Sequence, residues 1–176
     1  MRLFEDPGLP RAASAWPTPY RYEFRGAGEP VEPDVRRCIE RAGAHGLIDD
    51  LDRCDRFYLV WHDSEIVSYG AVFLASPQRS VLGLAPDAVL IGGCATRPAH
   101  RGRSLYRLAL NDTTLAMREL GRAKVFVEVR PENAPSIRGI QAAGLVERGE
   151  VDSKILLGTL VWRGGRLHRL RRGQSA

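Results

Sequence analysis

Apolar residues recur along the chain with two different periods, which predict its strands and helices. Continuous or alternating apolar runs over 20–24, 57–61, 66–74 and 87–95 favour β-strands. The last run is apolar on both faces, as expected for a strand in the covered centre of a sheet. The polar connection 62–65 between the second and third runs is typical of a hairpin.

Spacings of three and four residues predict helices. Residues 104–121 carry an apolar stripe that ends at a glycine, and residues 134–143 form a shorter helix that also ends at one. A third helical region covers 32–51, with a break expected near Gly46.

Two further strands, 124–129 and 155–162, complete the predicted order of elements. A meander of strands is followed by strand, helix, strand, helix and strand, so we expect an α/β protein with a mixed sheet flanked by helices. Four prolines within residues 1–19 predict an irregular N-terminal arm.

Length and composition fit one domain over residues 1–176, since 44% of the residues are hydrophobic. No apolar run reaches the roughly 18 residues of a membrane span, and the N-terminus lacks the charged-then-apolar order of a secretory signal. We therefore expect a soluble cytoplasmic protein with no membrane partner. The cysteines and histidines are scattered, which predicts no metal site.

The formal net charge of +5 is unevenly distributed. Arginines of the tail 163–176 account for the excess, which leaves the rest of the chain neutral overall. We expect this tail to be a solvated edge or a contact with a second copy of the chain in a homodimer. A nucleic-acid partner is not expected, because the chain carries no recognised binding motif.

The segment 91–106 offers the clearest candidate for chemistry. A covered strand runs through a proline-bearing turn into a long helix, whose first N–H groups and dipole favour an anion. Gly102 permits a close backbone approach. Basic side chains gather around the same point: Arg97, His100, Arg101, Arg103 and Arg107. A helix start with a solvated arginine face is the alternative.

Two stretches carry a family resemblance. Residues 95–110 (ATRPAHRGRSLYRLAL) and 124–149 (KVFVEVRPENAPSIRGIQAAGLVERG) resemble the GNAT superfamily of acyl-coenzyme A-dependent N-acyltransferases. The resemblance implies a GNAT-like fold with a central, partly splayed mixed sheet. It also implies acetyl-coenzyme A, or another acyl-coenzyme A, as co-substrate.

The resemblance implies a set of coenzyme-binding residues, while three positions depart from the family pattern. Ser104 stands where the family has glycine, Tyr106 where it has glycine or alanine, and Ile140 where many members carry a tyrosine acid. The implied coenzyme-binding residues are Cys94, Ala95, Thr96, Arg101, Gly102, Arg103, Ser104, Leu105, Tyr106, Asn133 and Ser136.

Candidate catalytic residues are Glu128, Tyr69 and Tyr106. An alkyl amine is protonated near neutral pH, so the reaction needs a base or an amine of low pKa. Glu128 is the first candidate base and an ion-pair partner is its alternative role; Tyr69 and His62 follow. Tyr106 is a candidate acid in place of Ile140.

Cys94 could be either an acylated nucleophile or a small buried residue. The leading function is transfer of an acyl group, an acetyl group foremost, to the primary amine of a small molecule. Transfer to a protein amine is a second hypothesis. A module that binds acyl-coenzyme A without turnover is a third.

Overall fold

The computed structural model describes residues 1–26, 36, 37, 40, 54–75 and 77–151, and beyond these the backbone of three short strands. The helical region expected over 32–51 therefore lies outside the described residues, apart from helical positions at Arg36, Arg37 and Glu40.

A seven-stranded mixed sheet forms the centre of the molecule, in the order β2-β3-β4-β5-β6-β1-β7. Neighbouring strands are antiparallel except β5 and β6, which are parallel. The strands are β1 (Arg2–Glu5), β2 (Tyr20–Gly26), β3 (Arg56–His62), β4 (Glu65–Phe73), β5 (Val89–Thr96), β6 (Val125–Val129) and β7 (Val146–Glu150). The mixed sheet predicted from the sequence is confirmed.

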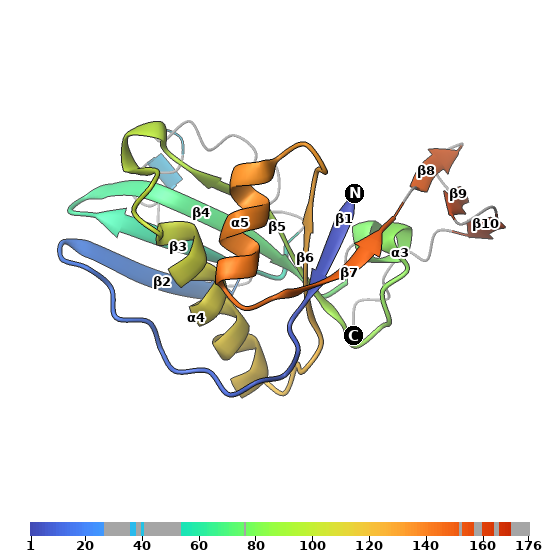
Figure 1. The fold of residues 1–176 in the computed structure, drawn as a ribbon, viewed down its shortest axis with the longest axis horizontal. Helices are drawn as coiled ribbons and strands as arrows, with labels where there is room; N and C mark the ends of the chain where they lie inside the picture. Colours follow the sequence, from blue (N-terminus) through green and yellow to red (C-terminus); the bar gives the residue numbers. More distant parts are fainter. Residues whose placement is uncertain are drawn as a thin grey trace.

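Helices α4 (Leu105–Glu119) and α5 (Ala134–Ala142) cover one face of this sheet, toward the viewer in Figure 1. Both lie close to their predicted positions. Their apolar sides, including Leu110 and Ile137, share one buried cluster with inward-facing strand residues such as Val127. A second cluster lies on the opposite face, where the short helix α3 (Pro77–Leu82) contributes Leu82.

The hairpin between β3 and β4 is tighter than the sequence predicted. Both strands continue through His62 and Glu65, which pair with each other, so that only Asp63 and Ser64 form the turn. Asp63 has a φ of 54°, the positive φ that the first position of such two-residue turns requires.

The prediction that residues 1–19 form an irregular arm is wrong at its start. Residues Arg2–Glu5 form β1, which inserts between β6 and β7 and pairs antiparallel with both. Leu3 and Phe4 point to opposite faces and are both buried, so this strand is covered on both sides. Four residues are too short a run to show a period in the sequence.

Two other predictions need correction. The single final strand expected over 155–162 is instead two antiparallel strands, β8 (Ser153–Leu156) and β9 (Leu160–Arg163). β9 pairs in turn with β10 (Arg166–Arg169), so strand structure extends into the predicted basic tail. Strand β7 and helix α3 carry no clear periodic pattern and were not expected.

Ion pairs and a hydrogen bond connect the segment after β1 to α4 and α5. Asp6, whose side chain is fully buried, binds Arg11 at 2.9 Å and accepts from Arg118 Nε of α4 at 2.6 Å. Arg11 also donates to the carbonyl of Ala143 at the end of α5. Across the described residues, no helix is both long and apolar enough to cross a membrane.

Candidate functional site

Strands β5 and β6 separate halfway along their length. Their parallel pairing runs from Val89 opposite Val125 to Ile91 opposite Val127 and then stops. β5 continues to Thr96 and stays paired with β4, where Tyr69 lies opposite Ala95. Gly93 has a φ of 61°, so the strand changes course just beyond the last pair. The partly splayed sheet implied by the resemblance is present.

A pocket of about 640 Å³ opens on the helix face beside this separation. Its walls come from the end of β5, the loop that leads into α4, and the first turns of α4 and α5. The predicted coenzyme-binding residues all line it: Cys94, Ala95, Thr96, Arg101, Gly102, Arg103, Ser104, Leu105, Tyr106, Asn133 and Ser136. The structure thus brings two distant sequence segments together at one cavity.

Cationic side chains surround the pocket. Arg101 is held in place because its Nε donates to the carbonyl of Thr96 at 3.0 Å. Arg103 and Arg107 line the pocket from the loop and from α4, and Arg138 lines it from α5. Arg138 was missed at the sequence level. Its spacing from Pro135 and Ala142, which share the pocket face of the helix, is the signal that could have found it.

The start of α4 is shaped to receive an anion. Ser104 is the N-cap with φ 61° and ψ 10°, and its side chain makes no capping hydrogen bond. The first N–H groups of a helix have no intrahelical partner. Gly102 has a φ of 75°, and a Cβ at this position would meet nothing within 4 Å. These residues fit the pyrophosphate of coenzyme A.

Asn133 caps the helix α5 at this site. It is the N-cap of α5, and its side chain accepts a hydrogen bond from the backbone N–H of Ser136 at 3.3 Å. This bond fixes the first turn of α5 at the mouth of the pocket. Asn133 and Ser136 therefore shape the pocket whether or not they touch a ligand.

Tyr106 forms part of the pocket wall, and its ring rests on α5. A Cβ added to Gly139 would lie 2.8 Å from Tyr106 Cδ1, so this glycine makes room for the ring. Burial and the nearby thiol of Cys94 raise the pKa of Tyr106 well above its ordinary value, so the phenol keeps its proton. Ile140, at the position of the family's tyrosine, is fully buried in the core.

Cys94 is not equipped to act as a nucleophile. Burial raises the pKa of its thiol to about 11, and the charge of Glu128 acts in the same direction. The thiol remains neutral at physiological pH, whereas nucleophilic attack needs the thiolate. Of the two roles considered from the sequence, the structure favours a small packed side chain: the Cys94 sulfur and the Tyr58 ring both pack over Gly70 at the inner wall of the pocket.

Glu128 and Tyr69 lie on the sheet face opposite to Tyr106. In β6, Val127 and Val129 belong to the cluster under the helices, so the side chain of Glu128 points to the other side. A Cβ at Gly92 would be 3.6 Å from Glu128 Oε1, which places this carboxylate at the strand separation. Tyr69 packs against the cluster on that same face, and burial raises its phenol pKa.

His62 lies in a separate cluster of rings. Its ring packs against Tyr20 and His100, with 4.9 Å between ring centroids in both cases, and its Nδ1 lies 3.3 Å from Asp63. The candidate catalytic residues therefore fall into three groups: Tyr106 and Cys94 at the pocket, Glu128 and Tyr69 on the opposite face of the sheet, and His62 in the ring cluster. Within the described ranges, no three side chains of metal-binding type gather at one point.

The fold has counterparts among solved structures. A putative GNAT-family acetyltransferase from Novosphingobium aromaticivorans superposes with a TM-score of 0.56 at 18% identity, covering 85% of this chain and 60% of that one. A GCN5-related N-acetyltransferase from Sphaerobacter thermophilus gives a TM-score of 0.58 at 15% identity, covering 84% of this chain and 48% of that one. The chain thus spans less than two thirds of either structure.

A third similar structure is the ribosomal-protein-S5-alanine acetyltransferase from Vibrio fischeri, with a TM-score of 0.53 at 15% identity over 78% of this chain and 84% of that one. Among curated proteins, no sequence matches this chain significantly. Residues 15–144 match the acetyltransferase (GNAT) family, a range that holds the pocket, the separated strands and both covering helices. The chain belongs to the GNAT acetyltransferase family.

Proposed function

We propose that this protein transfers an acyl group, an acetyl group foremost, from acyl-coenzyme A to the primary amine of a small molecule. The observation that carries the proposal is the arginine-lined pocket at the start of α4, which adjoins the separation of β5 and β6. The pocket lies on the helix face and Glu128 on the other, so the two substrates would meet between the strands.

The pocket residues would hold the phosphates of the co-substrate. Arg101 and Arg103 supply charged donors beside the free N–H groups of α4, and Arg138 supplies a third from α5. The end of β5, which is paired with β4 but no longer with β6, would offer backbone N–H groups to the thioester, with Cys94 as the candidate donor to the carbonyl oxygen. Removing such an oxyanion donor costs about 3–4 kcal/mol of transition-state stabilisation in other enzymes.

The chemical step is a direct displacement. The amine nitrogen attacks the thioester carbonyl, the carbon–nitrogen bond forms, the carbon–sulfur bond breaks, and coenzyme A leaves as a thiolate. Glu128 is the proposed acceptor of the amine proton. Tyr106, protonated and in the pocket wall, is the proposed donor to the leaving sulfur. The raised pKa of Tyr69 makes it a poor base, so its proposed role is a hydrogen bond to the acceptor.

Binding is tested by calorimetric titration with acetyl-coenzyme A. Arg101→Ala should weaken binding at least tenfold, because a charge-assisted contact to phosphate is lost. The control is Arg148→Ala, since Arg148 is an exposed arginine of β7 outside the pocket. Equal affinities in the two variants, or no heat of binding at millimolar acetyl-coenzyme A, would contradict the proposal that this pocket binds the co-substrate.

Turnover is tested by thiol release across a panel of small amines. Glu128→Gln should lower kcat by about 10²- to 10⁴-fold, the range for general acid–base catalysis, and leave the affinity for acetyl-coenzyme A unchanged. Glu119→Gln, an exposed carboxylate at the far end of α4, is the control. Tyr106→Phe should also lower kcat, without changing the amine preference.

A protein amine is the second candidate acceptor, favoured by the fold shared with an acetyltransferase named for ribosomal protein S5. Peptides with free N-termini belong in the same panel. Binding of acetyl-coenzyme A without thiol release from any acceptor would favour a binding module, the third hypothesis.

A further inference from the structure

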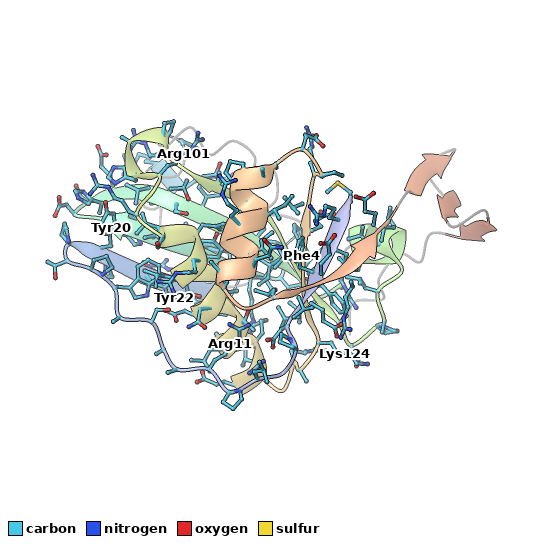
Figure 2. All side chains as sticks on the ribbon, viewed as in Figure 1. Phe4, Arg11, Tyr20, Tyr22, Arg101 and Lys124 are labelled. Atoms are coloured by element: carbon cyan, nitrogen blue, oxygen red, sulfur yellow. The ribbon has the colours of Figure 1, made fainter. Side chains whose placement is uncertain are left out.

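A tyrosine and two histidines form a cluster that the proposed catalytic step does not use. Tyr20 begins β2, His62 ends β3, and His100 belongs to the 3₁₀ turn Pro98–His100 before α4. Ring centroids are 4.9 Å apart for Tyr20 and His62, 4.9 Å for His62 and His100, and 5.9 Å for Tyr20 and His100. His100 also lines the arginine-rich pocket. Figure 2 shows Tyr20 and Arg101 at the same end of the molecule.

One hydrogen bond links the buried Tyr20 to His100. The hydroxyl of Tyr20 lies 3.1 Å from His100 Nδ1, and in the described part of the chain this nitrogen is its only partner. A phenol has one proton to donate, and a buried donor without an acceptor costs about 1–3 kcal/mol. With the Tyr20 hydroxyl as the donor, Nδ1 is the acceptor, and the proton of the neutral ring then lies on Nε2.

The surroundings favour a neutral His100 in the free protein. Burial lowers the pKa of His100, and the charges of His62, Arg103 and Arg97 lower it further, against a smaller effect of Glu65. Glu65 itself binds Arg97 at 2.9 Å. The titratable and charged groups that act on this ring come from several elements: Tyr20 from β2, His62 from β3, Glu65 from β4, and Arg97 and Arg103 from the loops around the 3₁₀ turn. Asp63 lies behind His62, 3.3 Å from its Nδ1.

We propose that Tyr20 is a positioning residue that holds His100 with its Nε2 proton available to a phosphate of acyl-coenzyme A. We propose further that His100 takes up a second proton, on Nδ1, when this phosphate binds, so that the Tyr20 hydroxyl then accepts a hydrogen bond from Nδ1 instead of donating one. The inference rests on the proposed function, because it assumes that the pocket receives coenzyme A. A phosphate beside the imidazole favours the charged ring, so the bound state holds more protons than the free state. Affinity must then rise as pH falls through the titration range of His100.

The hydrogen bond can be tested without any ligand. Long-range ¹H–¹⁵N NMR spectra of the free protein distinguish the two neutral tautomers of each histidine. His100 should be in the Nε2–H form, and Tyr20→Phe should convert it to a mixture. The control is Tyr22→Phe, two residues along the same strand, whose hydroxyl binds Thr113 at 3.0 Å. An Nδ1–H tautomer in the wild type would overturn the assignment.

Proton uptake is tested by calorimetry with coenzyme A in buffers of different ionisation enthalpy near pH 7. The phosphate monoester of the ligand titrates near pH 6, so the informative quantity is the difference between wild type and His100→Gln. The wild type should take up more protons on binding than His100→Gln does. Between pH 8 and pH 6, its affinity for coenzyme A should increase by a factor about three- to tenfold larger than that of the variant. Tyr20→Phe should still take up more protons than His100→Gln, because His100 carries the second proton, and Tyr22→Phe should match the wild type.

The outcomes separate the two proposals. Equal proton uptake by wild type and His100→Gln, with coenzyme A still bound, overturns this inference and leaves the proposed function standing. Failure of the wild type to bind coenzyme A overturns both.

Discussion

The aromatic ring of Tyr106 rests directly on Gly139, so that a Cβ on this glycine would lie 2.8 Å from Tyr106 Cδ1. Tyr106 stands at a position where the family has a glycine or alanine, and the space for its ring is provided by a glycine on the neighbouring helix. The two residues therefore act as a pair that sets the spacing of α4 and α5 at the pocket.

The contact between Tyr106 and Gly139 predicts that Gly139→Ala has opposite effects on protein stability with and without the tyrosine ring. Gly139→Ala should destabilise the protein by about 1–3 kcal/mol, as overpacking does, because the ring of Tyr106 is fixed between the helices. In a Tyr106→Ala background the same change should stabilise by about 0.5–1 kcal/mol, since alanine is the better helix former. Urea unfolding of the four proteins of this cycle measures both values. Losses of equal size in the two backgrounds would contradict the pairing.

The sequence predicts the site better than the strands that surround it. The run Arg101 to Leu105 is contiguous and leads directly into the strongly periodic helix α4, so its placement at the pocket followed from local pattern. The existence of β1 did not follow from local pattern, because its partners Val129 and Glu150 are more than a hundred residues away in sequence. Short strands acquire their structure from such distant partners.

The division of the catalytic candidates between two faces was also beyond the sequence. Tyr106 and Glu128 are both suited to proton transfer, but only the strand register and the course of α4 place them on opposite sides of the sheet. The cluster of Tyr20, His62 and His100 has the same origin, since it joins three elements that share no local pattern.

The backbone at Ser104 predicts a stabilising substitution. A non-glycine residue in the left-handed conformation is strained, and Ser104 has no capping hydrogen bond in return. Ser104→Gly should therefore stabilise the protein by about 1 kcal/mol, measured by urea unfolding. Ser136→Gly, within the first turn of α5, is the control and should destabilise by about 0.5–1 kcal/mol. Stabilisation by both changes, or by neither, would contradict strain at Ser104.

The thiol of Cys94 predicts slow alkylation. Its pKa, raised by burial from 9.0 to about 11, leaves about a hundredfold less thiolate at pH 8 than an unperturbed cysteine would have. Labelling by iodoacetamide, followed by mass spectrometry of the Cys94 peptide, should be slower than for an unfolded control by at least that factor. The rate should climb as pH rises toward 11, since an acid with a raised pKa stays neutral until then. A rate that levels off near pH 9 would contradict the raised pKa.

The ion pairs of Asp6 predict the largest loss of stability. Its side chain is fully buried between Arg11, which is 9% exposed, and Arg118, which is 20% exposed. Asp6→Asn keeps the shape but leaves two largely buried cations without their counterion, and removing one partner of a buried pair costs about 3–5 kcal/mol. Glu65→Gln is the control, because the pair of Glu65 with Arg97 is exposed and should contribute less than about 1 kcal/mol. Since Arg11 also binds the carbonyl at the end of α5, Asp6→Asn should loosen that helix first. Hydrogen exchange in α5 should therefore accelerate more than in β3, and uniform acceleration would place the loss in global unfolding alone.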